Sequence, residues 1–208
     1  MNRERPADLT AEVHRFKIAL TSDCLQRCSY CFIDKTASKT LSTARAKTAI
    51  DLFLGSPGNN KSLYLYGGEP FLHFRELKGA VVYASKLAES LKKNLAILVS
   101  TGGTCLSEEK LFFLRDAGVG LCFSLDGKPG TQNKYRYLKG GKSSFDLFIK
   151  NVELAFRTLG VARVGVSQGV HPGTASVMFE NYRFLVSLGL QNTNLEIIQG
   201  VPWSPQNK

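Results

Sequence analysis

Apolar residues recur along the chain in two alternating patterns. Short apolar runs, typical of buried strands, are separated by longer stretches in which apolar residues return every three or four positions, as on one face of a helix. Strands that alternate with helices are typical of a parallel sheet covered by helices. Six runs predict strands, at 16–20, 62–66, 95–100, 119–125, 161–167 and 194–199.

The stretches between these runs predict the helices. Ser107 is expected to cap one of them through its hydroxyl. Six strand–helix units in series, joined by right-handed crossovers, predict an α/β fold, a partial (β/α)6 TIM-like barrel of parallel strands with outer helices. Helical spacing covers 46–53, 77–91, 107–114 and 145–156, with a last helix over 176–188 and helix stops expected at Gly118, Gly160 and Gly189.

Unusual sequences follow directly after four of the predicted strands. In parallel α/β folds the working residues gather in the loops at the carboxyl ends of the strands, because those ends share one rim. The common position therefore predicts one functional site at that rim. The four segments are a cysteine loop at 24–32, a G-G-E-P run at 67–70, a T-G-G-T run at 101–104 and an S-L-D-G run at 124–127.

The first of these segments contains Cys24, Cys28 and Cys31 in a C-x3-C-x2-C pattern. Three thiolates can hold a cubane iron–sulfur cluster and leave one iron without a protein ligand, where a small molecule can bind and receive an electron. A zinc site completed from elsewhere, a disulfide-bearing loop and buried thiols without function are the alternatives. The remaining cysteines, Cys105 and Cys122, lie in apolar surroundings and are interpreted as small core hydrophobes.

Composition narrows the domain count and the cellular setting. The 208 residues, 43% of them hydrophobic, suffice for one sizeable core. The first fifteen residues mix charges without an apolar stretch, and no later run approaches the ~20 apolar residues that a membrane span needs. We expect a cytoplasmic protein with reduced thiols, made of an N-terminal extension (1–15), a core domain (16–200) and a C-terminal tail (201–208).

The net charge of +10 favours anionic partners without identifying one. The segment 127–145 is basic and lacks acidic residues, so it could meet phosphate, carboxylate or an acidic peptide. No helix-turn-helix, zinc-finger or RNA-binding signature favours nucleic acid, which stays open as a partner. The cations of this segment are Lys128, Lys134, Arg136, Lys139 and Lys142.

Taken together, the motifs resemble the radical S-adenosylmethionine (radical SAM) superfamily. The resemblance rests on C-x3-C-x-Y-C-F, G-G-E-P and S-L-D-G, in this order on successive strand–helix units, and it covers 16–199. It is nearest to the peptide- and protein-modifying branch, which includes sulfatase-maturating enzymes and ribosomal-peptide maturases. It implies an enzyme that reductively cleaves S-adenosylmethionine at a [4Fe-4S] cluster to a 5′-deoxyadenosyl radical, which abstracts hydrogen from a substrate.

The resemblance also implies which residues hold the two cofactors. The three clustered cysteines would bind the cluster, and the amino and carboxylate groups of S-adenosylmethionine would chelate its fourth iron. Gly67 and Gly68 would let the backbone approach the methionine moiety, and Glu69 would accept hydrogen bonds from its ammonium group. An ordinary glycine turn ahead of a helix is the alternative.

Other loops would complete the cofactor site. Tyr30 and Phe32 would shield the cluster and the adenine, although core packing is an equal interpretation. Ser124 resembles a ribose or carboxylate contact, and Arg136 resembles an arginine that forks onto the cofactor carboxylate. Asp126 would either bind the loop that starts at Gly127 or contact the ligand. The full predicted cofactor-binding set is Tyr30, Phe32, Gly67, Gly68, Glu69, Pro70, Thr101, Ser124, Asp126 and Arg136.

Three departures from the family pattern limit this inference. Gly102 stands where the peptide-modifying branch often has the asparagine of T-N-G-T, so one polar cofactor contact is missing or replaced. Gln132 and Asn133 stand where a histidine and an aspartate often precede the arginine, which removes a titrating pair. No cysteine-rich extension follows Gly200, so sulfatase maturation is less expected. We expect a minimal or truncated enzyme, or a partner chain that covers the open side of the barrel.

No residue is assigned a catalytic role of its own. Radical chemistry of this kind needs positioned reactants and the exclusion of water rather than acid–base groups. The favoured substrate is a peptide or protein side chain, through the resemblance alone. An external one-electron donor, flavodoxin- or ferredoxin-like, is implied as a partner, and a membrane is not. The alternatives are a radical SAM enzyme that acts on RNA or a small metabolite, and a non-catalytic iron–sulfur subunit for electron transfer or assembly.

Overall fold

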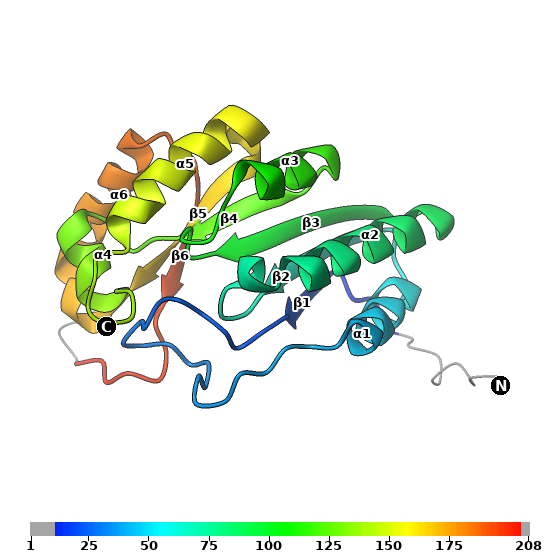
Figure 1. The fold of residues 1–208 in the computed structure, drawn as a ribbon, viewed down its shortest axis with the longest axis horizontal. Coiled ribbons are helices and arrows are strands. Elements are labelled where there is room, and N and C mark those ends of the chain that lie inside the picture. The colour runs from blue at the N-terminus through cyan, green and yellow to red at the C-terminus, as the bar shows by residue number, and fades with distance from the viewer. Residues whose placement is uncertain (1–10, 205–208) are drawn as a thin grey trace.

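The computed structural model describes residues 11–204, which form one curled six-stranded sheet with helices outside it (Figure 1). The strands lie in sequence order, and every neighbouring pair is parallel. This confirms the predicted partial barrel of parallel strands. The strands are β1 (Arg15–Ala19), β2 (Asn60–Tyr66), β3 (Asn94–Thr101), β4 (Gly120–Ser124), β5 (Val164–Val170) and β6 (Asn192–Ile197).

Helices connect the successive strands and cover the outer face of the sheet (Figure 1). A long loop after β1, drawn in blue, runs along the side that the helices leave open. The α-helices are α1 (Thr43–Gly55), α2 (Phe74–Ser90), α3 (Glu108–Asp116), α4 (Pro129–Tyr135), α5 (Phe145–Leu159) and α6 (Met178–Ser187). Short 3-10 helices are η1 (Pro70–His73), η2 (Val161–Arg163) and η3 (Pro172–Val177).

The hydrophobic core lies between the sheet and these helices. Leu63 and Leu65 of β2 are fully buried and belong to one cluster with Ile50 of α1, Leu77 of α2 and Phe148 of α5. Burying a side chain of this size stabilises the fold by roughly 1.5–3 kcal/mol. Because the cluster is continuous from the first helices to the last, the described residues share one core, as expected from the length of the chain.

Helix ends follow the local signals in the sequence. The Ser107 hydroxyl accepts a hydrogen bond from the Lys110 N–H and caps α3, as predicted. Gly118, Gly160 and Gly189 adopt φ values of +67°, +79° and +88° just beyond α3, α5 and α6. L-residues with a side chain rarely adopt this conformation, so these glycines end the helices where expected.

Some element bounds differ from the prediction. The apolar run expected to be a strand at 161–167 begins as η2, and β5 spans Val164–Val170 instead. The sequence pattern missed α4, whose only buried residues are Gln132 and Tyr135, because such a short polar helix carries no apolar period. The last helix begins two residues later than expected, since η3 occupies the chain before it.

The termini of the described chain bear on two further predictions. Residues 1–10 of the expected extension and 205–208 of the expected tail lie outside the described residues, so the division into extension, core and tail stays a prediction. In the tail, the Trp203 indole N–H donates to the Ile198 carbonyl at 2.9 Å. Within 11–204, no helix has the length and apolar character that crossing a bilayer requires.

Candidate functional site

The cysteine loop after β1 is joined to the G-G-E-P run after β2 through the main chain. The Gly68 N–H donates to the Thr21 carbonyl at 2.7 Å, and the Glu69 N–H donates to the Asp23 carbonyl at 2.6 Å. These bonds lie directly before Cys24. The structure thus brings together two of the segments that the sequence placed at one rim.

Gly67 and Gly68 permit this close approach. Gly67 has φ +142°, and a Cβ there would lie 2.5 Å from the Thr21 carbonyl oxygen. A Cβ on Gly68 would lie 2.2 Å from the Asp23 carbonyl oxygen, closer than real side chains come to a backbone atom. The glycines therefore serve the packing of one loop on the other, and their predicted approach to a methionine moiety stays a prediction.

Glu69 joins the end of β2 to the end of β3. Its carboxylate is fully buried and accepts from the Thr101 hydroxyl at 2.9 Å and from the Gly102 N–H at 3.0 Å. Burial raises the pKa of this carboxyl group, while the bond from Thr101 opposes the rise. Pro70, also buried, follows as the first residue of η1. The role of Glu69 seen here is structural, and its predicted contact with an ammonium group stays a prediction.

The three clustered cysteines are each partly buried, and no disulfide joins any of the five cysteines, all of which lie within the described residues. Among residues 11–204, no three His, Cys, Asp or Glu side chains are gathered closely enough to hold a metal ion. Burial raises the pKa of the Cys24 thiol, and the Gln26 N–H donates to its sulfur at 3.4 Å. Three thiols on one irregular loop are nevertheless the kind of ligand that binds an open [4Fe-4S] cluster, and one of them accepts a hydrogen bond from a backbone N–H.

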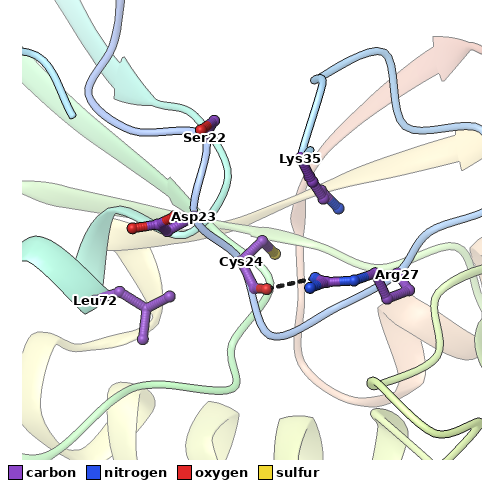
Figure 2. A pocket seen from close by; sticks show the side chains of 6 residues that line it. All are labelled: Ser22, Asp23, Cys24, Arg27, Lys35 and Leu72. Atoms are coloured by element: carbon purple, nitrogen blue, oxygen red, sulfur yellow. Dashed lines mark hydrogen bonds between the residues drawn. The ribbon is translucent and has the colours of Figure 1, made fainter. Parts of the chain in front are cut away.

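A pocket of about 320 Å³ opens beside Cys24 (Figure 2). Two cations line it, Arg27 and Lys35, and Figure 2 shows the Arg27 guanidinium donating to the Cys24 carbonyl, at 2.7 Å. The Lys35 ammonium donates to the Gln26 carbonyl at 3.0 Å. The Lys35 charge opposes the rise that burial causes in the pKa of the Cys24 thiol, although burial outweighs it.

Tyr30, Asp126 and Arg136 form a second, buried network. The Tyr30 hydroxyl donates to the Asp126 carboxylate at 2.5 Å and accepts from the Arg136 guanidinium at 2.9 Å. Burial raises the pKa of Asp126, and the Arg136 charge opposes the rise. Burial likewise raises the pKa of Tyr30. The network ties the cysteine loop to the loop after β4 and to the end of α4.

The positions of these side chains correct two expectations. The Asp126 carboxylate contacts Tyr30 and Arg136, 3.7 Å away, and not the loop at Gly127 that the sequence suggested. Phe32 is 82% exposed, so it packs in no core, and its shielding role stays a prediction. Ser124 is half-buried at the last position of β4, opposite Ser167 of β5, and its cofactor contact stays a prediction.

Two residues of the unusual Gln132-Asn133 pair build the loop around Asp126. The Gln132 side chain is fully buried, accepts from the Asp126 N–H at 3.0 Å and donates to the Ser144 hydroxyl at 3.3 Å. The Asn133 side chain accepts from the Ser144 N–H at 3.0 Å and from the Phe145 N–H at 3.2 Å, at the start of α5. The sequence indicated only the loss of a titrating pair and gave no sign of this structural role.

Cys105 and Cys122 lie outside the cysteine loop. Both are half-buried, and burial raises the pKa of each thiol to about 11. Cys105 packs against the hydrophobic core. These surroundings are those expected of cysteines that act as small core hydrophobes.

The fold and the rim motifs together define a radical SAM protein, and comparison with family models agrees. The model described as the Radical SAM superfamily matches residues 18–173, and the chain belongs to this family. The match includes all three clustered cysteines and every predicted cofactor-binding residue.

Among curated proteins, the chain is similar to a cysteine-type anaerobic sulfatase-maturating enzyme of Clostridium novyi (strain NT), at 24% identity over 144 residues. That match covers 66% of this chain and 38% of the relative. Two solved structures of anSMEcpe share the fold of this chain. The one with bound AdoMet and Kp18Cys peptide has a TM-score of 0.79 at 19% identity, covering 93% of this chain and 56% of that one. The one with AdoMet alone has a TM-score of 0.76 at 18% identity, covering 89% and 51%.

The hydrogenase maturase HydG of Carboxydothermus hydrogenoformans has a related fold, with a TM-score of 0.61 at 14% identity. The match covers 88% of this chain and 44% of HydG. The chain thus spans only about half the length of the relatives that it matches, or less. At these identities the solved structures show the fold alone.

Proposed function

We propose that this chain binds a [4Fe-4S] cluster through Cys24, Cys28 and Cys31, binds S-adenosylmethionine at the open iron, and cleaves it reductively. The observation that carries the proposal is the joining of three strand ends beside the thiols. Gly68 bonds to the start of the cysteine loop, and Glu69 bonds to Thr101 at the end of β3. A small molecule at the cysteines would therefore lie against the G-G-E-P and T-G-G-T runs.

The cluster held by Cys24, Cys28 and Cys31 would supply the electron for reductive cleavage of S-adenosylmethionine and for hydrogen abstraction from the substrate. The protein holds and surrounds the reactants. Arg27 and Lys35 supply positive charge beside Cys24. Tyr30, through Asp126, anchors the stretch of loop between Cys28 and Cys31. Fixing that stretch limits movement of the thiols and access of water. Both restrictions are needed where catalysis depends on positioning the reactants.

Arg136 is suited to bind a carboxylate in this site. Its guanidinium is mostly buried and donates to the Tyr30 hydroxyl, while its Nε has no hydrogen-bond partner among the described residues. A buried guanidinium N–H without a partner is unfavourable, and a carboxylate can accept from two guanidinium N–H groups at once. The cofactor carboxylate is the acceptor that we propose for it.

A peptide or protein side chain is the substrate that we propose. The curated relative is a sulfatase-maturating enzyme, and one related structure holds a peptide together with AdoMet. Three lysines of the basic segment, Lys134, Lys139 and Lys142, are exposed and could attract an acidic peptide. The proposal also requires a one-electron donor, for which a flavodoxin- or ferredoxin-like protein is suited, and the cytoplasmic location stays a prediction.

The test is anaerobic reconstitution with iron and sulfide, followed by dithionite and S-adenosylmethionine. We expect a brown protein with about four irons per chain that releases 5′-deoxyadenosine. A variant with all three clustered cysteines changed to alanine should do neither, whereas Cys122→Ala should do both. A colourless, zinc-loaded protein would contradict the enzyme proposal. A cluster that binds no S-adenosylmethionine would favour the electron-transfer alternative.

A further inference from the structure

Gln26 lies between two of the proposed cluster ligands and has a buried amide group without a partner. The residue is 2% exposed, and its Nε2 has no hydrogen-bond acceptor among the described residues. Buried polar groups of folded proteins nearly always have a partner, because an unpaired one loses its bonds to water. An unpaired amide at this position therefore calls for an acceptor that comes from outside the chain.

The Gln26 side chain fills the space above Gly102, at the carboxyl end of β3. A Cβ on Gly102 would lie 2.2 Å from the Gln26 Oε1 and 3.5 Å from its Nε2. The Gly102 N–H is itself bonded to the buried Glu69 carboxylate. The carboxamide of Gln26 thus stands where a side chain at position 102 would otherwise stand, beside Glu69 and the cysteine loop.

The backbone of Gln26 is held on several sides. It forms an antiparallel bridge with Leu138. Its carbonyl accepts from Arg27 and from Lys35, each at 3.0 Å. Its N–H donates to the Cys24 sulfur at 3.4 Å. The unpaired amide is therefore part of a constrained loop at the site.

Gln132 shows what a structural glutamine looks like in this protein. It is as deeply buried as Gln26, but both ends of its carboxamide are bonded, to Asp126 and to Ser144. Gln26 lacks such a bond on its amide nitrogen. The contrast separates a glutamine that the fold uses from one that the fold leaves available.

We propose that the Gln26 amide donates a hydrogen bond to bound S-adenosylmethionine, in place of the asparagine that the family resemblance leads us to expect at position 102. Glutamine and asparagine end in the same carboxamide, so the donor is retained although it comes from a different loop. The carboxylate and hydroxyl oxygens of the cofactor are suitable acceptors. The proposal rests on the proposed function, since it names one more residue of that cofactor site.

The test compares three variants, Gln26→Leu, Gly102→Asn and the double variant Gln26→Ala/Gly102→Asn. In reconstituted protein, Gln26→Leu should raise the Kd of S-adenosylmethionine about fivefold to tenfold, the loss expected for one hydrogen bond, with unchanged iron content. Gly102→Asn alone should weaken binding and lower the Tm, because its side chain meets Gln26. The double variant should return the Kd to within about twofold of the wild type.

The Tm of the cluster-free protein separates a binding role from a structural one. Gln26→Leu should leave this Tm nearly unchanged, whereas the matched control Gln132→Leu should lower it. An unchanged Kd in Gln26→Leu, or a double variant that folds but does not recover affinity, would overturn the role of Gln26. A wild-type protein that binds no S-adenosylmethionine would instead overturn the proposed function, so the two failures are distinguishable.

Discussion

The ends of β1 and β2 are held together differently from the end of β4. At β1 and β2, main-chain groups bond to main-chain groups, and Gly67 and Gly68 leave no room for side chains. At the end of β4, side chains make the connections, from Tyr30 through Asp126 to Arg136. The first half of this rim, at β1 and β2, therefore depends on backbone approach. The second half, at β4, depends on the identity of particular side chains.

This difference teaches where each half tolerates substitution. A backbone contact fails when a side chain is inserted, whereas a side-chain network fails when a polar atom is deleted. Insertion at the glycines of the first half should therefore cost more than deletion of one hydroxyl in the second half. Substitution on the exposed outer strand β6, where Ile197 is 67% exposed, should cost least.

The largest effect is expected for Gly68→Ala. The added Cβ would lie 2.2 Å from the Asp23 carbonyl oxygen, so the two loops must separate. We expect a loss of about 3 kcal/mol in the free energy of unfolding of the cluster-free protein, measured by urea denaturation. The control is Gly79→Ala in α2, where nothing lies within 4 Å. It should gain about 0.5–1 kcal/mol from helix propensity. Equal stability of the two variants would contradict the backbone account.

A smaller loss is expected for Thr101→Val. The substitution removes the hydroxyl that donates to the buried Glu69 carboxylate and accepts from the Gly103 N–H at 2.9 Å. Leaving these groups unpaired should lower the free energy of unfolding by about 2 kcal/mol in the same denaturation experiment. Thr48→Val on exposed α1 should change it by less than about 0.5 kcal/mol. A Thr101→Val protein as stable as the wild type would show that the bond between Thr101 and Glu69 contributes little to the free energy of unfolding.

Tyr30→Phe tests the side-chain network of the second half. Loss of the hydroxyl removes one bond to Asp126 and one from Arg136, which should cost about 1.5 kcal/mol by denaturation. Tyr83→Phe is the matched control, because the Tyr83 hydroxyl makes the same kind of bond to Asp51 at an exposed position. Its effect should stay below about 0.5 kcal/mol. If both variants lose the same free energy of unfolding, the buried network of Tyr30 stabilises the protein no more than the exposed bond of Tyr83 does.

The smallest effect is expected for Ile197→Ser on β6. Its side chain is largely exposed, so little apolar surface returns to water when it is replaced. The free energy of unfolding should change by less than about 0.5 kcal/mol, whereas Leu121→Ala in the core of β4 should lose about 2–5 kcal/mol. A large loss in Ile197→Ser would mean that β6 is packed more tightly than its exposure indicates.

Much of the fold could be predicted from the sequence, because its apolar runs are repeated signals. The six strands follow from short apolar runs, and the rim follows from where G-G-E-P and S-L-D-G stand after them. The short helix α4 could not be predicted, since only Gln132 and Tyr135 of its seven residues are buried. Its bonds are side-chain contacts that leave no period in the sequence.

The site was predicted less fully, for a physical reason. Sequence position assigns residues to a rim but does not tell which way a side chain turns. Glu69 turns inward to Thr101, and Asp126 turns to Tyr30, a residue 96 positions away. The pairing of Gln26 with Gly102 has the same origin, since it joins loops after β1 and β3. Only the folded chain brings these residues within reach of one another.

The carbonyl oxygens of Thr21 and Asp23, which receive the Gly68 and Glu69 N–H groups, exist in all twenty amino acids. A library randomised at positions 21 and 23 would therefore keep both acceptors in nearly every clone. A library randomised at position 68 would retain the contact only in clones that keep a glycine codon. Substitutions at positions 21 and 23 are therefore compatible with this contact, whereas substitutions of Gly68 are not.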